Sequence, residues 1–159
     1  MIDYEALLQV QGVKDLLARQ IPATSLMTGE QFLSLFGKVV STSGVLAADL
    51  YSRMGINTSK MRSQHLSRPC GKVLVAVLCH LAQANLQIQT VQQARDACIL
   101  ICTIPSDMLS FKGELIVTVT KKGTGTQLEA ATKIPGQKYD WGKGKKILER
   151  LFESAAKDI

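Results

Sequence analysis

Histidine, aromatic residues and long apolar runs are all scarce in this chain of 159 residues. The only histidines, His65 and His80, leave few general bases, and no Gly-x-Ser-x-Gly elbow is present for a serine nucleophile. One tryptophan, three tyrosines and four phenylalanines give no stacking platform on the predicted strands for single-stranded nucleic acid. The longest weakly polar stretch, residues 39–48, is far shorter than the roughly 20 residues of a spanning helix. We therefore expect no membrane span and no enzymatic activity.

Cysteine is also sparse, and its four positions suit neither a disulfide scaffold nor a zinc site. Cys70, Cys79, Cys98 and Cys102 include no Cys-x-x-Cys pair of the kind that zinc sites use. If Cys98 and Cys102 lie four residues apart on one strand, their Cα atoms are about 13 Å apart, beyond the limit of about 7 Å for a disulfide. His80 adjoins Cys79, but helix neighbours point about 100° apart and do not form a base–nucleophile pair. We expect reduced, buried thiols and neither a metal nor another cofactor.

Acidic residues are absent between Asp49 and Asp96, which makes the basic excess of the chain regional. The formal net charge is +6, and such an excess favours acidic partners without naming one. Phosphate contacts tolerate varied spacing, so weak, salt-sensitive nucleic-acid binding through the basic linker of residues 56–68 and the C-terminal lysines is an alternative function. The basic residues in the gap are Arg53, Lys60, Arg62, Arg68, Lys72 and Arg95.

The start of the chain, Met-Ile-Asp-Tyr-Glu, carries acids where a secretion signal has a basic region before an apolar run. On this ground we expect a cytoplasmic location.

The N-terminal part of the chain shows helical patterns. Residues 3–19 have apolar residues at helical spacing and end before Pro22, and Thr28-Gly-Glu-Gln31 has the form of a capping box that opens a second helix. We therefore predict a helical extension over residues 1–55. Residues 56–68 are polar and basic with little periodicity, which predicts a linker and a domain boundary.

The pattern of residues 69–159, in which strand-like runs follow a helical segment, predicts an α+β domain. Ser67 as cap and Pro69 in the first turn would open a helix over residues 71–85, which is apolar on both sides and so needs cover on both. Four strand-like runs follow, and Lys121-Lys-Gly-Thr-Gly-Thr126 has the glycines of a tight turn. The predicted architecture is N-terminal helices, then a helix, a four-stranded antiparallel meander and a C-terminal helix in two layers. The four runs begin at Leu86, Ala97, Glu114 and Gln127.

The stretch "KIPGQKYDWGKGKKILERLF", residues 133–152, does not match a phosphate-binding loop, because Lys143 is followed by Gly144 where a metal-binding hydroxyl belongs. We interpret it as the start of the closing helix, with Asp140 as its cap and Trp141 in its buried stripe. Its lysines crowd the positive end of the helix dipole, which is compatible with an anion nearby. The candidate contacts for an anion or partner are Lys143, Lys145, Lys146, Arg62 and Arg68.

The same region carries a resemblance. A helix, a meander containing "IPSDMLSFKGELIVTV", a last strand and "YDWGKGKKILERLF" together resemble a poorly characterised bacterial α+β domain in which Asp-Trp-Gly-Lys opens the closing helix. The resemblance covers about residues 70–155 and implies the fold. It implies no activity, cofactor or catalytic residue.

The doubly apolar helix 71–85 leads to our first functional hypothesis. We expect a non-enzymatic binding or regulatory module that engages another protein, itself as a homo-oligomer, or a small apolar ligand. The N-terminal extension is the natural cover for the outer side of this helix, and if it does not serve, a second subunit must.

Overall fold

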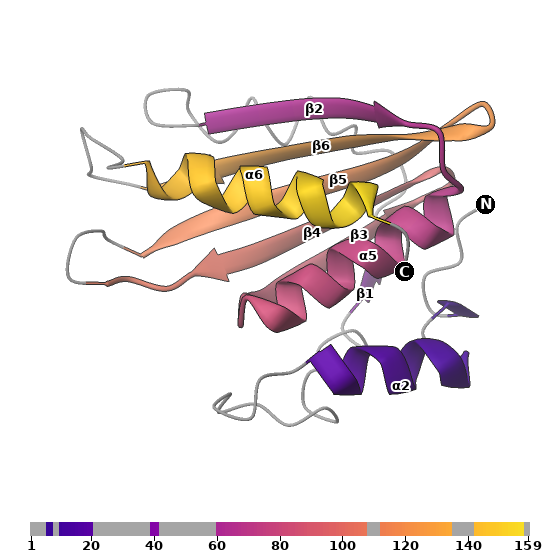
Figure 1. The fold of residues 1–159 in the computed structure, drawn as a ribbon, viewed down its shortest axis with the longest axis horizontal. Coiled ribbons are helices and arrows are strands. Elements are labelled where there is room, and N and C mark those ends of the chain that lie inside the picture. The colour runs from indigo at the N-terminus through magenta and orange to yellow at the C-terminus, as the bar shows by residue number, and fades with distance from the viewer. Residues whose placement is uncertain are drawn as a thin grey trace.

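The protein combines helices with one mainly antiparallel sheet, as the sequence predicts (Figure 1). The computed structural model describes residues 6–7, 10–20, 39–41, 60–107, 112–134 and 142–157. In chain order the elements are α2 (Gln11–Gln20), β1 (Val39–Ser41), β2 (Lys60–Leu66), α5 (Cys70–Gln83), β3 (Gln87–Ala94), β4 (Ala97–Ile104), β5 (Gly113–Lys122), β6 (Gly125–Lys133) and α6 (Lys143–Ala156).

The predicted meander is confirmed as β3 to β6, which pair in sequence and antiparallel. The turn between β5 and β6 contains Gly123 at φ +59°, a conformation that glycine adopts without the steric cost that other residues incur. Lys122 pairs with Gly125 across this turn, so the register agrees with the predicted tight connection.

The sheet is wider than predicted, because two further strands flank the meander in the order β1-β3-β4-β5-β6-β2. β2 lies within the segment predicted as a linker, and Lys60–Leu66 pairs antiparallel with β6. As an edge strand, β2 exposes most of its residues, so its polar and basic composition gave no apolar alternation to detect. The short β1 pairs in parallel with β3 and corrects the helix predicted across residues 39–41. The rest of that predicted helix lies outside the described residues.

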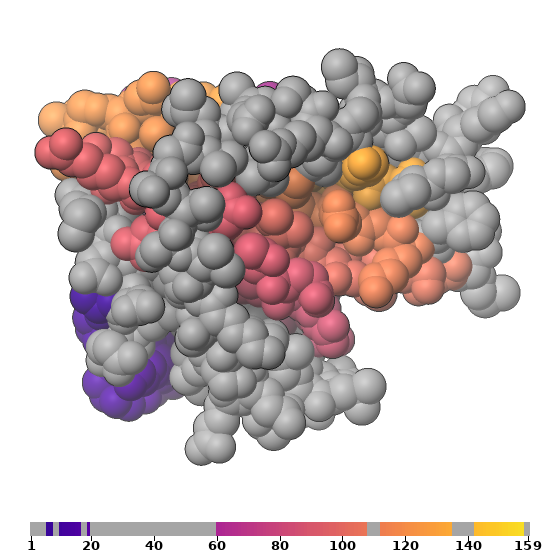
Figure 2. Space-filling view, turned by 180° about the vertical axis from the view of Figure 1, so that it is seen from behind, coloured from indigo at the N-terminus to yellow at the C-terminus, as the bar shows by residue number. Residues whose placement is uncertain are grey.

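The main core lies between the sheet and the two helices α5 and α6, which lie in front of it in Figure 1. Alternate residues of the central strands point into it, among them Leu100, Leu115 and Val117, all with 0% exposure. Figure 2 looks from behind, where strand residues coloured red to orange reach the surface. The intervening residues of these strands belong to the opposite face of the sheet, and among them Ile99 and Ile116 are also buried.

All four cysteines are free and buried, as predicted. Burial raises the pKa of the Cys98 thiol to about 12 and also raises that of Cys102. Because the thiolate is the nucleophile, these two thiols are chemically quiet at neutral pH.

The N-terminal helix α2 packs against α5 and so helps to cover its outer side. Leu7, Val13 and Leu16 are half-buried and touch the core, and an added Cβ at Gly71 would lie 3.9 Å from a Leu7 methyl. Residues of the same chain thus cover part of the second apolar side of α5. Of this helix, Val73, Val77 and Leu78 are fully buried.

Both predicted caps need correction. α5 has Pro69 at its N-cap with no side-chain hydrogen bond, so Ser67 does not cap it. α6 begins at Lys143 with Gly142 at its N-cap in the left-handed conformation, not near Asp140. The buried stripe predicted for α6 is confirmed at Gly144, Leu148, Leu151 and Ala155, while Trp141 and Asp140 lie outside the described residues.

Candidate functional site

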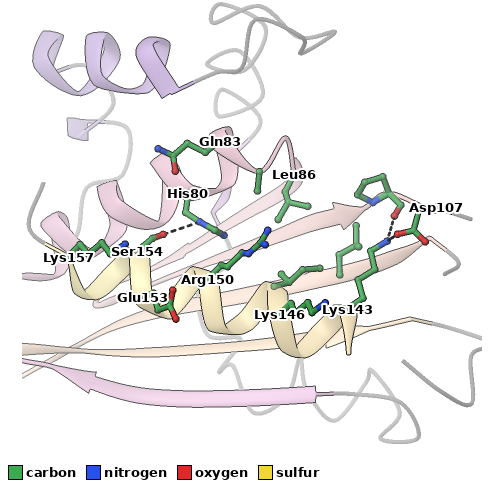
Figure 3. A pocket seen from close by; sticks show the side chains of 14 residues that line it. His80, Gln83, Leu86, Asp107, Lys143, Lys146, Arg150, Glu153, Ser154 and Lys157 are labelled. Carbon is green, nitrogen blue, oxygen red and sulfur yellow. Dashed lines mark hydrogen bonds and ion pairs between the residues drawn. The ribbon is translucent and has the colours of Figure 1, made fainter. Parts of the chain in front are cut away.

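A groove of about 710 Å³ runs between α5 and α6 beside the end of β4 (Figure 3). On α6 its lining residues recur three or four positions apart, next to the buried stripe, so one face of the helix borders the groove from end to end. The lining comprises His80, Gln83, Ala84, Leu86, Ile104, Pro105, Asp107, Lys143, Lys146, Ile147, Arg150, Glu153, Ser154 and Lys157.

The apolar part of the groove is formed by Leu86, Ile104 and Ile147. Leu86 is placed by the end of α5, where Leu86 N–H donates to the Leu81 carbonyl and Asn85 N–H donates to the Ala82 carbonyl. This is a Schellman motif, and Asn85 at φ 54° takes its left-handed position, which asparagine tolerates. The chain therefore turns directly from α5 to the strand that follows and leaves Leu86 at the groove.

Lys143 closes one end of the groove. Its Nζ donates to Asp107 Oδ2 at 2.7 Å and to the Pro105 carbonyl at 2.8 Å. These bonds tie the start of α6 to the segment after β4. The positive charge of Lys143 is thereby paired, in contrast to the two cations further along the helix.

Lys146 and Arg150 form no salt bridge within the part of the chain that the structure describes. Figure 3 shows the Arg150 guanidinium directed from α6 toward α5, whereas the Glu153 carboxylate is turned away from His80. The middle of the groove is consequently positive.

His80 reaches the groove from α5 and is 8% exposed. Its Nδ1 lies 3.1 Å from Ser154 Oγ, a hydrogen bond that joins the two helices (Figure 3). Burial lowers the pKa of His80 from its ordinary value, and the positive charge of Arg150 lowers it further. The imidazole is therefore neutral at pH 7, with one ring nitrogen held by Ser154.

A catalytic triad combines a nucleophile, a histidine base and a carboxylate that orients the histidine. Ser154 and His80 correspond to the first two of these groups. No carboxylate is bonded to the imidazole within the described residues, so nothing there would orient it as a base. No cluster of three metal-ligating side chains occurs among the same residues. The arrangement can offer donors and positive charge to a bound molecule.

The residues predicted from the sequence as anion contacts are not gathered in one place. Lys143 and Lys146 border the groove, whereas Lys145 points elsewhere and lies 3.7 Å from Glu149 as an exposed i,i+4 pair. Arg62 on β2 lies over the Phe152 ring, 4.9 Å from its centroid. Arg68 donates to the Ala155 and Lys157 carbonyls at 2.6 Å each and so satisfies the end of α6.

Sequence reasoning missed Arg150 and Ser154 and placed His80 only on a helix face. A signal existed in α6, because Lys143, Lys146, Arg150, Ser154 and Lys157 follow helical spacing. His80 could not be joined to them from the sequence, since the two helices are 59 residues or more apart and only the fold sets them side by side.

Comparison of the chain with protein-family models, curated proteins and solved structures found no match. Among the helices of the described residues, none combines the length and apolar character needed to cross a membrane.

Proposed function

We propose that this protein is a non-enzymatic binding module whose α5–α6 groove holds a small amphipathic anion. The observation that carries the proposal is the groove itself, in which Lys146 and Arg150 lie beside an apolar surface and have no ion-pair partner among the described residues. A ligand with one acidic end and an apolar body would meet both features. The proposal narrows the partner expected from the sequence to one class of small molecule.

The size of the groove supports a ligand of this kind. Its volume of about 710 Å³ falls within the range of about 300–1,000 Å³ typical of small-molecule sites. Among the apolar lining residues, Ala84 and Pro105 are exposed and Ile147 is half-buried, whereas Leu86 and Ile104 are already buried within the protein. Burying the exposed apolar surface contributes roughly 25 cal/mol per Å² before the costs of association.

The charge around the groove favours an acidic ligand over a neutral one. Lys146 and Arg150 have no counter-ion among the described residues, and Asp107 is already engaged by Lys143. An anion placed near Arg150 would gain a charge-assisted hydrogen bond, which is about twice as strong as a neutral one.

Nucleic-acid binding is less well supported. Two arginines on which it depended have roles within the molecule, Arg62 over Phe152 and Arg68 at the end of α6. The remaining lysines at positions 143, 145 and 146 include two with ion-pair partners. A steep loss of oligonucleotide binding with salt would be required to revive this function.

The test uses anilinonaphthalene sulfonate, an amphipathic anion whose fluorescence rises in apolar sites. The Ala84→Trp variant fills the groove from the exposed C-cap of α5, and Ala156→Trp places the same side chain on an exposed part of α6 outside it. We expect saturable binding by the native protein and by Ala156→Trp, and a loss of about tenfold or more in Ala84→Trp, because a filled groove removes most of the ligand's buried surface.

Both variants should keep the native circular dichroism spectrum and melting temperature within a few degrees, because both positions are exposed. Equal binding by Ala84→Trp and Ala156→Trp would contradict the proposal.

A further inference from the structure

We propose that Arg150, His80 and Ser154 form the head-group subsite of the groove and that this subsite takes the carboxylate of an amphipathic monocarboxylic acid. The inference rests on the proposed function and assigns the ligand class and the residues that select it. It also implies that binding is coupled to uptake of a proton by His80.

The three side chains converge from two helices (Figure 3). Ser154 follows Arg150 by four residues, so both lie on the same face of α6. His80 approaches from α5, and its Nδ1 is held by Ser154 Oγ at 3.1 Å. The subsite is therefore built from one flexible cation and one imidazole fixed by a hydrogen bond.

The second nitrogen of His80 completes the set of donors. Its Nε2 has no hydrogen-bond partner within the described residues, although the side chain is 8% exposed and lines the groove. When the Ser154 hydroxyl donates to Nδ1, the proton of neutral His80 is on Nε2. When His80 is protonated, both nitrogens donate and the hydroxyl accepts. In either state Nε2 can donate to an acidic oxygen.

The surroundings favour one negative charge over two. His80 lies in the last turn of α5, and Ser154 in the last turn of α6, so the negative ends of both helix dipoles lie near the subsite. A dianionic phosphate would be disfavoured there. A carboxylate carries a single charge and matches the two parallel donors of the Arg150 guanidinium.

The apolar body of the acid has a defined direction. Arg150 is seven residues, or about 10 Å along the helix, from Lys143, and Ile147 lies between them on α6. Leu86 and Ile104 line the same groove. An alkyl chain whose carboxylate binds at Arg150 would lie along these three side chains. The bridge closes the far end.

Protonation of His80 should accompany binding. From α6 and its C-cap, Arg150, Glu153 and Lys157 line this part of the groove, with the Glu153 carboxylate turned away from His80 (Figure 3). Among the described residues of α5, neutral Gln83 joins them. Asp107, beyond β4, is held by Lys143, and the described side chains of α2 are not part of the lining. A bound carboxylate would offset the positive charge of Arg150 and favour the imidazolium, so affinity rises as pH falls through the pKa of His80 in the complex.

The experiment is calorimetric titration of the full chain with sodium decanoate below its micelle concentration, with decyl phosphate as the dianionic comparison. Arg150→Gln is matched by Lys145→Gln, which also removes one positive charge from α6 but lies outside the groove. We expect Arg150→Gln to weaken decanoate binding about tenfold or more and Lys145→Gln to change it less than about twofold. Ser154→Ala should weaken binding by a smaller factor, and decyl phosphate should bind less tightly than decanoate.

The proton is followed in the same system. Near pH 6, the binding heat in two buffers of different ionisation enthalpy should reveal proton uptake. Histidine-ring NMR should show the pKa of His80 rising with decanoate, and His65, which lies outside the groove lining, marks the second set of ring signals. The head-group subsite would be overturned by equal losses of decanoate affinity in Arg150→Gln and Lys145→Gln, by no proton uptake, or by tighter binding of decyl phosphate than of decanoate. None of these results would contradict the groove as the binding site. Unchanged decanoate affinity in Ala84→Trp would overturn the groove as well.

Discussion

At the scale of single residues, His80 combines burial with a nearby positive charge. Both effects disfavour its protonated form, so its pKa in the folded protein lies below the ordinary value of 6.5. In the unfolded chain the same imidazole takes up a proton at that ordinary value. The unfolded state thus binds more protons between the two pKa values, and acidification there favours unfolding.

We therefore predict that the free energy of unfolding falls as pH decreases below about 6.5 and stops responding to His80 below its folded-state pKa. In His80→Gln this component should disappear, so its stability should depend less on pH over the same interval. Urea denaturation at a series of pH values checks this. An unchanged slope in the variant would show that His80 does not carry the effect.

Arg68 provides the second prediction at this scale. Its guanidinium donates to two carbonyls at the end of α6, Ala155 and Lys157, which the helix itself leaves without donors. Arg68→Ala should lower the free energy of unfolding by about 1.5–3 kcal/mol, the cost of losing hydrogen bonds from a charged group. Exposed Lys72 serves as control, since Lys72→Ala should change stability by less than about 0.5 kcal/mol. Similar values for the two variants would contradict this assignment.

At the scale of elements, the most regular segments could be predicted and the edges could not. Strand 97–104 is read correctly because "ACILICTI" is a compact apolar run, and the helix of residues 70–83 because its apolar residues continue for four turns. β2 was not predicted because most residues of this edge strand are exposed, so its sequence does not alternate between apolar and polar residues. The caps were predicted wrongly because the sequence favours side-chain caps at Ser67 and Asp140, whereas the N-cap residues are Pro69 and Gly142 and neither helix has a side-chain cap hydrogen bond.

The candidate site shows the same division. The lysines of residues 143–146 could be noticed because their charge opposes the helix dipole, a local property. The partnership of His80 with Ser154 depends on how α5 and α6 pack on the sheet, which involves residues 74 positions apart. No periodicity in either helix contains that information.

Two glycines give a prediction about elements. A Cβ at Gly113 would lie 2.6 Å from the Lys133 carbonyl oxygen of the neighbouring strand, whereas a Cβ at Gly12 in α2 would meet nothing within 4 Å. Gly113→Ala should destabilise the protein by about 1–3 kcal/mol, because the sheet must shift. Gly12→Ala should stabilise it by about 0.5–1 kcal/mol through helix propensity. Thermal and urea unfolding of both variants measure this contrast, and shifts of the same sign would contradict it.

At the scale of the whole molecule, α2 covers part of the apolar outer side of α5. Leu16 contacts the core from α2, while Gln11 on the same helix is exposed. Leu16→Asp should therefore weaken the packing of α2 on α5, since placing a carboxylate without a partner against the apolar core is costly even at a half-buried position. We expect a lower melting temperature and a greater sedimentation coefficient from self-association through the uncovered face.

Gln11→Asp introduces the same charge on the exposed side of α2. It replaces the hydrogen bond from Gln11 Nε2 to Asp15 Oδ1 with an exposed i,i+4 repulsion, so it should lower the melting temperature only slightly and leave the sedimentation coefficient unchanged. Analytical ultracentrifugation of the two variants at equal concentration makes the comparison. A monomeric Leu16→Asp protein of native stability would show that α2 is dispensable as cover.

The most direct test of the groove as a binding site is amide NMR of the full chain during titration with decanoate. We predict that the largest shift changes fall on residues 80–86 at and after the end of α5, on Ile104, and on residues 143–157 of α6 and its C-cap. These residues are distant in sequence and meet only around the groove. Saturable changes centred elsewhere, for example around Ile99 and Ile116 on the opposite face of the sheet, would contradict it.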